Sequence, residues 1–296
     1  FGLAYVITVV CLGAMHWQPL KQALAIYQKL RVSMNNEYHW WDLEDSSFKG
    51  VLYDSINCYF LHDLPYKNWE EFSEADPHMA YAQLTYVRFY MLEQQFIDLR
   101  VIPQMLGVET VPVKSSVQDI DRYDWLKSIV DLTLFRFSSL RDIAFHFVNE
   151  VLELGLSDFQ LNIKQLKKAL KTEYPEILED LKTLDKTGEE LRTDRNDRAH
   201  KGFSELYTGD DQMFKNMSWM EGKVIDNTEY DLVGIYEKSR DKICELVVQE
   251  VQVALKATIN LVDNCYNHYR DTHLRLSRGS AMGVSQHFPL HCERDS

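Results

Sequence analysis

Hydrophobic residues recur at three- and four-residue steps through most of the chain, which is the spacing of amphipathic helices. This pattern predicts a helix over residues 18–31 and another over 79–100, after the break at Asp76-Pro77. Residues 101–117 contain two prolines and a glycine and have the composition of a linker. We therefore expect a domain boundary near residue 115.

Four further helices are predicted after the linker, each with one apolar stripe: residues 124–156, 157–184, 189–203 and 232–276. Gly155 would close the first of them, and Ser157 would be the N-cap of the second, with a kink at Pro175. Gly188 separates the second from the third. Residues 202–228 would be a long connection, whose apolar side chains either pack on the helices or form a lid or partner surface. Four helices of this kind make a bundle.

The predicted fold class is therefore all-α. A mainly helical N-terminal region over residues 1–115, which would sense, dock or restrain, precedes a four-helix bundle over residues 116–276. Helical periodicity is lost over residues 277–296, so we expect a disordered tail there, either native or an artificial remnant.

Composition agrees with the helical prediction and limits the partners. Only 12 Gly and 7 Pro occur in 296 residues, which argues against a turn-rich β architecture. The net charge of -13 provides no general attraction to nucleic acid or to an anionic membrane, so a polyanion must be bound at a local basic site. Five cysteines without a CxxC pair indicate free thiols in a reducing compartment, and hence a cytoplasmic protein.

The chain opens with an uncharged apolar segment over residues 1–15. This segment is shorter than the roughly 20 apolar residues that span a bilayer, and no Lys or Arg precedes it as in a signal peptide. A buried helix or strand is favoured over the end of a membrane or signal segment truncated upstream. We therefore expect no membrane association.

The sequence Arg195-Asn196-Asp197-Arg198-Ala199-His200 is the strongest candidate for chemistry. On a helix, Asn196 and His200 lie one turn apart on a common face, with Arg195 at its flank. A histidine can move a proton at a phosphodiester, and a guanidinium can hold the phosphate and its transition-state charge. That scheme requires no metal and no cofactor. From the spacing alone, a solvated polar helix face is the competing interpretation.

These six residues resemble the R-x4-H motif, in its RN-x3-H form, of the HEPN superfamily (higher eukaryotes and prokaryotes nucleotide-binding). They fall on the predicted third helix of the bundle, where that family carries the motif. The long helix before them, with residues 135–142 (FRFSSLRD), also looks like that of bacterial HEPN toxins and defence proteins. The resemblance covers about half the chain and implies a bundle with a metal-independent endoribonuclease site in the cleft of a homodimer.

The resemblance also implies roles for individual residues. His200 would be the acid or base, Arg195 the phosphate ligand and Asn196 the group that orients them. Arg198 and Lys201 would add local positive charge.

Arg141 and Asp142 could supply a supporting contact to substrate, or a salt bridge within the bundle. RNA is the implied substrate, and an antitoxin or defence protein the implied partner. Gly202 stands where family members that are silenced by nucleotidyl transfer carry a Tyr, so that form of regulation is not implied.

Other interpretations remain open. The bundle could be a non-catalytic dimerisation or nucleotide-binding module in which the motif is only a polar seam. His287, His291 and Cys292 have metal-ligand spacing, but no further ligand is nearby, so no metal site is predicted there. A stripe of four lysines over residues 164–171 is either a solvated face or a surface that steers RNA.

Overall fold

The computed structural model describes residues 68–107, 120–193, 206–221 and 231–278, together with Leu43, Ser46, Phe48 and Asn196. The helix predicted over 18–31, the apolar segment 1–15 and all but the start of the predicted tail lie outside these residues.

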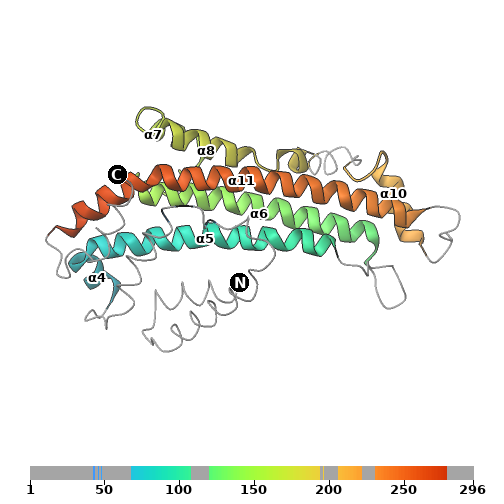
Figure 1. Ribbon diagram of the computed structural model, residues 1–296, viewed down its shortest axis with the longest axis horizontal. Coiled ribbons are helices and arrows are strands. Elements are labelled where there is room, and N and C mark those ends of the chain that lie inside the picture. Colours follow the sequence, from blue (N-terminus) through green and yellow to red (C-terminus); the bar gives the residue numbers. More distant parts are fainter. Residues whose placement is uncertain are drawn as a thin grey trace. The chain divides into compact units, whose positions relative to one another are not determined.

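The described residues form helices and no strand, which confirms the all-α prediction. Figure 1 labels the helices along the chain. They are α4 (Trp69–Ala75), α5 (Pro77–Leu106), α6 (Arg122–Val151), α7 (Ile163–Leu170), α8 (Pro175–Lys186), α10 (Asp211–Met220) and α11 (Leu232–Ser277). None of them is long and apolar enough to cross a membrane.

Helix α5 continues six residues beyond the predicted end at residue 100, so the expected linker does not begin at 101. Pro103 lies inside its last turns, where it removes a backbone donor. The apolar stripe nevertheless continues through Ile102 and Leu106, which are buried. Their burial outweighs the cost of the proline, and the helix ends at Leu106. The N–H of the next residue, Gly107, donates to the Pro103 carbonyl at 2.9 Å.

Helix α6 ends at Val151, four residues before the predicted stop at Gly155. The residue that turns the chain is Glu153, whose φ of 49° is left-handed. The Leu154 N–H donates to the Asn149 carbonyl at 3.0 Å, and the Glu153 N–H donates to the Glu150 carbonyl at 3.2 Å. This pair of bonds is a Schellman motif built without a glycine.

The second predicted helix is two helices. Asn162 is the N-cap of α7, and its side-chain oxygen accepts the N–H groups of Lys164 and Gln165. Ser157 therefore does not start this helix. Pro175 begins α8 instead of kinking a continuous helix, in keeping with the preference of proline for the first helical position.

The predicted connection over residues 202–228 contains helix α10. Asp210 is its N-cap, accepting the Met213 N–H at 2.9 Å. Within α10, Phe214 and Met217 are buried, whereas the Met213 and Trp219 side chains are about half exposed. The sequence predicted a long loop here because a ten-residue helix with a mixed apolar pattern gives a weak periodic signal.

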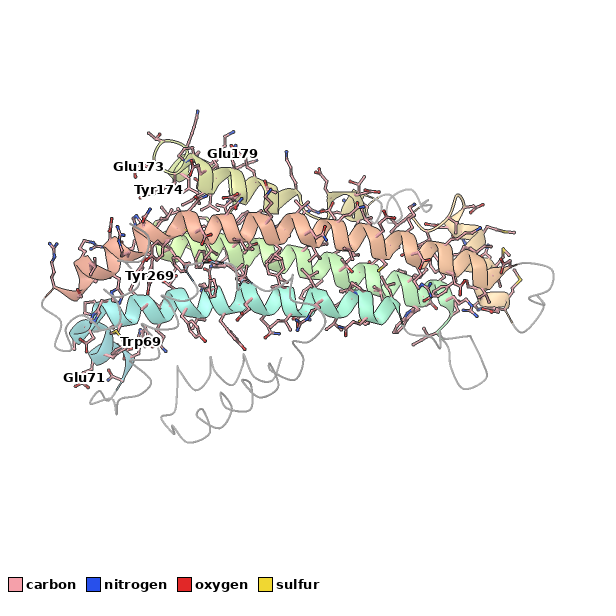
Figure 2. All side chains as sticks on the ribbon, viewed as in Figure 1. Trp69, Glu71, Glu173, Tyr174, Glu179 and Tyr269 are labelled. Atoms are coloured by element: carbon pink, nitrogen blue, oxygen red, sulfur yellow. The ribbon has the colours of Figure 1, made fainter. Side chains whose placement is uncertain are left out.

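The chain divides into two compact units. The described part of the first comprises residues 68–94, 143–181 and 258–278 with Leu43, Ser46 and Phe48. Its core is aromatic: the Phe48 ring lies 5.0 Å from that of Tyr269 and 5.8 Å from that of Phe147. Tyr269, labelled in Figure 2, also stacks on Tyr81, whose hydroxyl donates to the Val151 carbonyl at 2.8 Å.

This first unit also buries two histidines. His78 of α5 and His273 of α11 are both fully buried, and their ring centroids are 5.1 Å apart. Burial, with the neighbouring His78, lowers the pKa of His273 to about 3. The folded chain therefore keeps His273 neutral at ordinary pH.

The described part of the second unit comprises residues 95–107, 120–142, 182–193, 206–221 and 231–257 with Asn196. At the start of α6, Arg122 makes a two-pronged ion pair with the Glu221 carboxylate, at 2.9 Å from its Nε to Oε2. Both side chains are almost fully buried, and the Arg122 guanidinium lies 5.6 Å from the Tyr236 ring centroid. A buried ionic contact thus joins α6 to the end of α10 and the start of α11.

Candidate functional site

Three of the predicted site residues lie within the described part of the chain. Asn196 is helical and exposed, and Arg141 and Asp142 lie on α6. The other four, Arg195, Arg198, His200 and Lys201, lie outside the described residues. Residues 189–193 are also helical, as predicted for the helix that carries the motif. We call residues 189–193 with Asn196 the motif helix. The described residues thus show the start of this helix and the residues that contact it.

Gly188 fixes where the motif helix begins. Its φ of 71° is left-handed, so a glycine is needed at the turn that follows α8. Its N–H donates to the Glu250 Oε2 of α11 at 2.8 Å. An added Cβ at Gly188 would lie 2.9 Å from Cδ2 of the buried Phe137 ring of α6. This turn is therefore held between α6 and α11, and the predicted break at Gly188 is confirmed.

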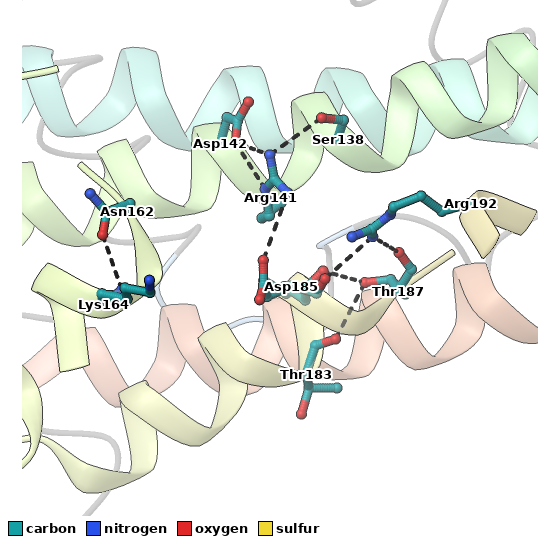
Figure 3. Close-up of polar contacts among 10 residues, drawn as sticks. Ser138, Arg141, Asp142, Asn162, Lys164, Thr183, Asp185, Thr187 and Arg192 are labelled. Carbon is teal, nitrogen blue, oxygen red and sulfur yellow. Dashed lines mark hydrogen bonds and ion pairs between the residues drawn. The ribbon is translucent and has the colours of Figure 1, made fainter. Parts of the chain in front are cut away.

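Arg192 ties the first turn of the motif helix back to the end of α8. Its Nη2 donates to the Thr187 carbonyl at 3.1 Å and to the Asp185 carbonyl at 3.3 Å (Figure 3). These carbonyls belong to a helix end, whose orphan acceptors favour a cation. The Thr187 hydroxyl donates to the Leu184 carbonyl at 2.6 Å in the same way. The entry to the motif helix is therefore well fixed by hydrogen bonds.

Arg141 and Asp142 pair with each other. Arg141 donates from Nε and Nη2 to Asp142 Oδ1 at 2.9 and 2.8 Å, and its Nη1 lies 3.7 Å from Asp185 Oδ1 (Figure 3). Its Nη2 also lies 3.4 Å from the Ser138 hydroxyl. Arg141 thus makes the salt bridge within the bundle that was one of its two predicted roles, linking α6 to the end of α8. The role in substrate binding stays a prediction.

A cavity of about 270 Å³ lies beside this entry. Its lining includes aromatic rings, hydroxyls and guanidinium groups from two segments: Phe135, Phe137, Ser138, Arg141, Thr187 and Arg192. Aromatic, hydroxyl and guanidinium groups together can bind a ligand that has both a flat ring and an anionic group. The cavity is adjacent to the helix that begins at residue 189, because Arg192 in the first turn of that helix lines it.

Sequence reasoning missed Arg192 and Phe135 as members of this region. The signal for Arg192 was its position four residues before Asn196, which places both on one helix face. Phe135 could have been noticed as an aromatic residue outside the apolar stripe of its helix; its side chain is 56% exposed. Neither signal shows that α6 and the end of α8 meet at one cavity.

Other predicted features show no sign of a binding site. The lysines of α7 are all exposed, as a solvated face would be. In the described part of the chain, no three His, Cys, Asp or Glu side chains gather as metal ligands would. Cys244 and Cys265 are free, as predicted, and burial raises the pKa of the Cys265 thiol. The other three cysteines and the cluster at residues 287–292 lie outside the described residues.

Comparison with known proteins gives one family. Searches of curated proteins and of solved structures find no match. A family model described as HEPN_Cthe2314-like HEPN matches residues 87–258, more than half of the chain. The matched range begins inside the predicted N-terminal region, so the division at residue 115 stays a prediction. The match includes α6, α7, α8 and α10 and the residues 195–200 that carry the motif. The chain therefore belongs to the HEPN superfamily, in the HEPN_Cthe2314-like family.

Proposed function

We propose that this protein is a metal-independent endoribonuclease whose site is formed by Arg195, Asn196 and His200. The RNA 2′-oxygen attacks the adjacent phosphorus while His200, as general base, takes its proton, and the bond to the 5′-oxygen breaks. A protonated histidine, from the same or the partner subunit, then gives a proton to the leaving 5′-oxygen. The products are a 2′,3′-cyclic phosphate and a 5′-hydroxyl, so the step needs neither water nor a metal.

One observation carries the proposal: a chain of the HEPN family has the R-x4-H pattern directly after the helical residues 189–193, which follow the Gly188 turn. Asn196 is helical and exposed there, which leaves its amide available to a substrate or to a neighbouring side chain. Its position four residues before His200 sets both on one face of a continuing helix. Arg195 at the flank would bind the phosphate through its fork of donors.

The charged residues around the motif support a small, local binding site for the substrate. Arg198 and Lys201 follow the motif, and Arg141 and Asp142 lie beside the entry to the motif helix. The chain as a whole carries -13, so RNA would be attracted only where such arginines and lysines gather. This arrangement suits a cytoplasmic enzyme of bacterial defence or of a toxin–antitoxin pair, active as a homodimer and restrained by a partner protein.

The test is cleavage in the presence of a chelator. Purified protein and its His200→Ala and Arg195→Ala variants are incubated with labelled single-stranded RNA and bulk tRNA, and the product ends are analysed. We expect cyclic-phosphate ends from the parent protein, and a cleavage rate at least roughly 100-fold slower in either variant. If all three proteins cleave at the same rate, the site assignment is wrong.

Light scattering of the same samples gives the oligomeric state. A stable dimer that cleaves no RNA, alone or with its partner, would instead support the non-catalytic interaction module.

A further inference from the structure

The cavity beside the motif helix has two chemically different walls. Phe135, Ser138 and Arg141 follow one another at three-residue steps and so lie on one face of α6. Thr187 lies in the turn after α8, and Arg192 lies in the first turn of the helix that follows it. At about 270 Å³, the cavity is slightly smaller than the roughly 300–1,000 Å³ of typical ligand sites, which suits a single nucleotide unit and not a longer ligand.

The aromatic wall is an exposed ring. The Phe135 side chain is 56% exposed, whereas Phe137, two residues on, is 3% exposed and packs inside. The Arg136 guanidinium lies 5.8 Å from the Phe135 ring centroid and is itself held by Asp98 of α5 at 2.7 Å. A flat ring that stays open to solvent beside guanidinium groups is the platform on which unpaired bases stack.

The charged wall has two guanidinium groups, of which Arg141 has acidic partners and Arg192 has neutral ones. Arg141 is paired with Asp142 and, at 3.7 Å, with Asp185. These carboxylates are 57% and 35% exposed, so the pairs contribute little stability and can exchange for a phosphate. The two groups that accept from Arg192 are backbone carbonyls, which do not neutralise its charge. The acidic member of the lining, Asp131, is paired with Lys127 at 2.7 Å.

We propose that this cavity is a nucleotide subsite for single-stranded RNA. Phe135 stacks on a base, and Arg141 and Arg192 bind the neighbouring phosphate. Its role in cleavage rests on the proposed function: Arg192 precedes Asn196 by four residues, about 6 Å along the axis of a continuous helix, so the bound nucleotide would flank the bond that is cut. Since every base has a stacking face, the subsite accepts RNA with little base preference.

Binding is measured apart from cleavage. The parent protein for this test is the full chain carrying His200→Ala, which is expected to leave RNA intact. It is titrated into a fluorescein-labelled single-stranded RNA of about seven nucleotides, a length within the range that single-strand binding sites cover. Fluorescence anisotropy is followed at several salt concentrations. The substitutions Phe135→Ala and Arg141→Gln are then introduced, one at a time, into this parent protein. The matched controls are Phe159→Ala, a fully exposed phenylalanine outside the cavity, and Arg240→Gln. Arg240 pairs with Asp241 in the same adjacent manner, with side chains 28% and 68% exposed against 27% and 57% for Arg141 and Asp142.

Each variant has its own expected signature. Phe135→Ala should weaken binding on the order of 5- to 150-fold, with an unchanged salt dependence, because a stacking contact and not a charge is lost. Arg141→Gln should reduce the slope of log K against log salt by about 0.7, the contribution of one phosphate contact to single-stranded RNA. Phe135→Tyr should retain the parent affinity because it keeps the ring, and both controls should bind like the parent.

Two outcomes overturn the subsite: a parent that binds no RNA, and cavity variants that bind like their controls. Either outcome counts against the subsite whatever the cleavage assay gives. If the protein with His200 intact cleaves nothing while Phe135→Ala and Arg141→Gln lose binding as expected, the catalytic proposal fails and the subsite stands. Thermal unfolding of each variant checks that Phe135→Ala, a change at an exposed ring, leaves the fold intact.

Discussion

Replacing Gly188 by alanine tests whether the turn before the motif helix is held as tightly as its contacts indicate. Alanine is strained in the left-handed backbone, because φ is 71° at this position. It also adds a methyl group 2.9 Å from Cδ2 of the Phe137 ring, closer than carbon atoms approach without a shift. Gly155→Ala is the matched control: φ is 64° there, and an added Cβ meets no atom within 4 Å.

Comparing the two variants therefore separates the free-energy cost of a non-glycine residue in the left-handed backbone from the cost of crowding against Phe137. A non-glycine residue in the left-handed region costs about 1–2 kcal/mol, and both variants should lose this amount. Crowding a packed core adds about 1–3 kcal/mol, which only Gly188→Ala should lose because Phe137 is buried. We expect Gly188→Ala to lower the free energy of unfolding by roughly 2–5 kcal/mol in total. Gly155→Ala should lower it by about 1–2 kcal/mol.

Urea unfolding followed by circular dichroism measures both variants, with the midpoint compared at an unchanged m-value. Adding Phe137→Leu to Gly188→Ala should recover part of the loss, because a smaller side chain makes room for the methyl group. The reasoning is refuted if the two glycine variants lose the same free energy, since the contact with Phe137 would then contribute nothing. Under the proposed function, Gly188→Ala should also slow RNA cleavage, whereas Gly155→Ala should not.

Three further results are expected from other parts of the chain. Burial lowers the pKa of His273 to about 3, so between about pH 6.5 and 3 the unfolded chain binds a proton that the folded chain does not. Stability should therefore fall by about 1.4 kcal/mol per pH unit as the pH drops through this window, and an equally steep fall in His273→Phe would contradict this. Glu221→Leu should cost about 3–5 kcal/mol in urea unfolding by leaving Arg122 buried without its carboxylate, and Arg122→Met with Glu221→Leu should recover most of it; equal single and double losses would show that the ion pair is not the cause. Asp210→Ala should cost about 1 kcal/mol through the lost cap of α10, whereas Asp210→Asn should retain most of the cap, and equal losses in both variants would argue against capping.

The long helices could be predicted from sequence because their periodic stripes outweigh local detail. The predicted range 232–276 differs from α11 by one residue, since dozens of residues repeat one pattern there. Boundaries depended on single residues and were less predictable. Ser157 and Asn162 are both good caps, and the choice of Asn162 becomes clear only when Leu166 and Leu170 are seen to be buried. A glutamate in the left-handed conformation, as at Glu153, has no sequence signal at all.

The candidate site was predictable only as far as it is local in sequence. The motif of residues 195–200 and the glycine before it follow from spacing along one helix. The arrangement around them depends on pairs that are distant in sequence, such as Gly188 with Glu250 and Arg141 with Asp185. A single sequence contains no signal that two such residues are in contact. Arg192 therefore looked like one more charged residue, and its place between α8 and the cavity came from the structure.

An acidic protein can still bind a phosphate if its positive groups are gathered at one place. Charges more than about 8 Å apart are largely screened at physiological salt, so most of the net -13 acts weakly on a ligand beside Arg141 and Arg192. What the net charge does affect is the encounter, because RNA is repelled at long range and is not steered to the site. Under the proposed subsite, association should thus be slow at low salt and should speed up as salt is added, even while equilibrium binding weakens. Stopped-flow association rates measured across the same salt series would test this opposite dependence, which a uniformly basic RNA-binding protein does not have.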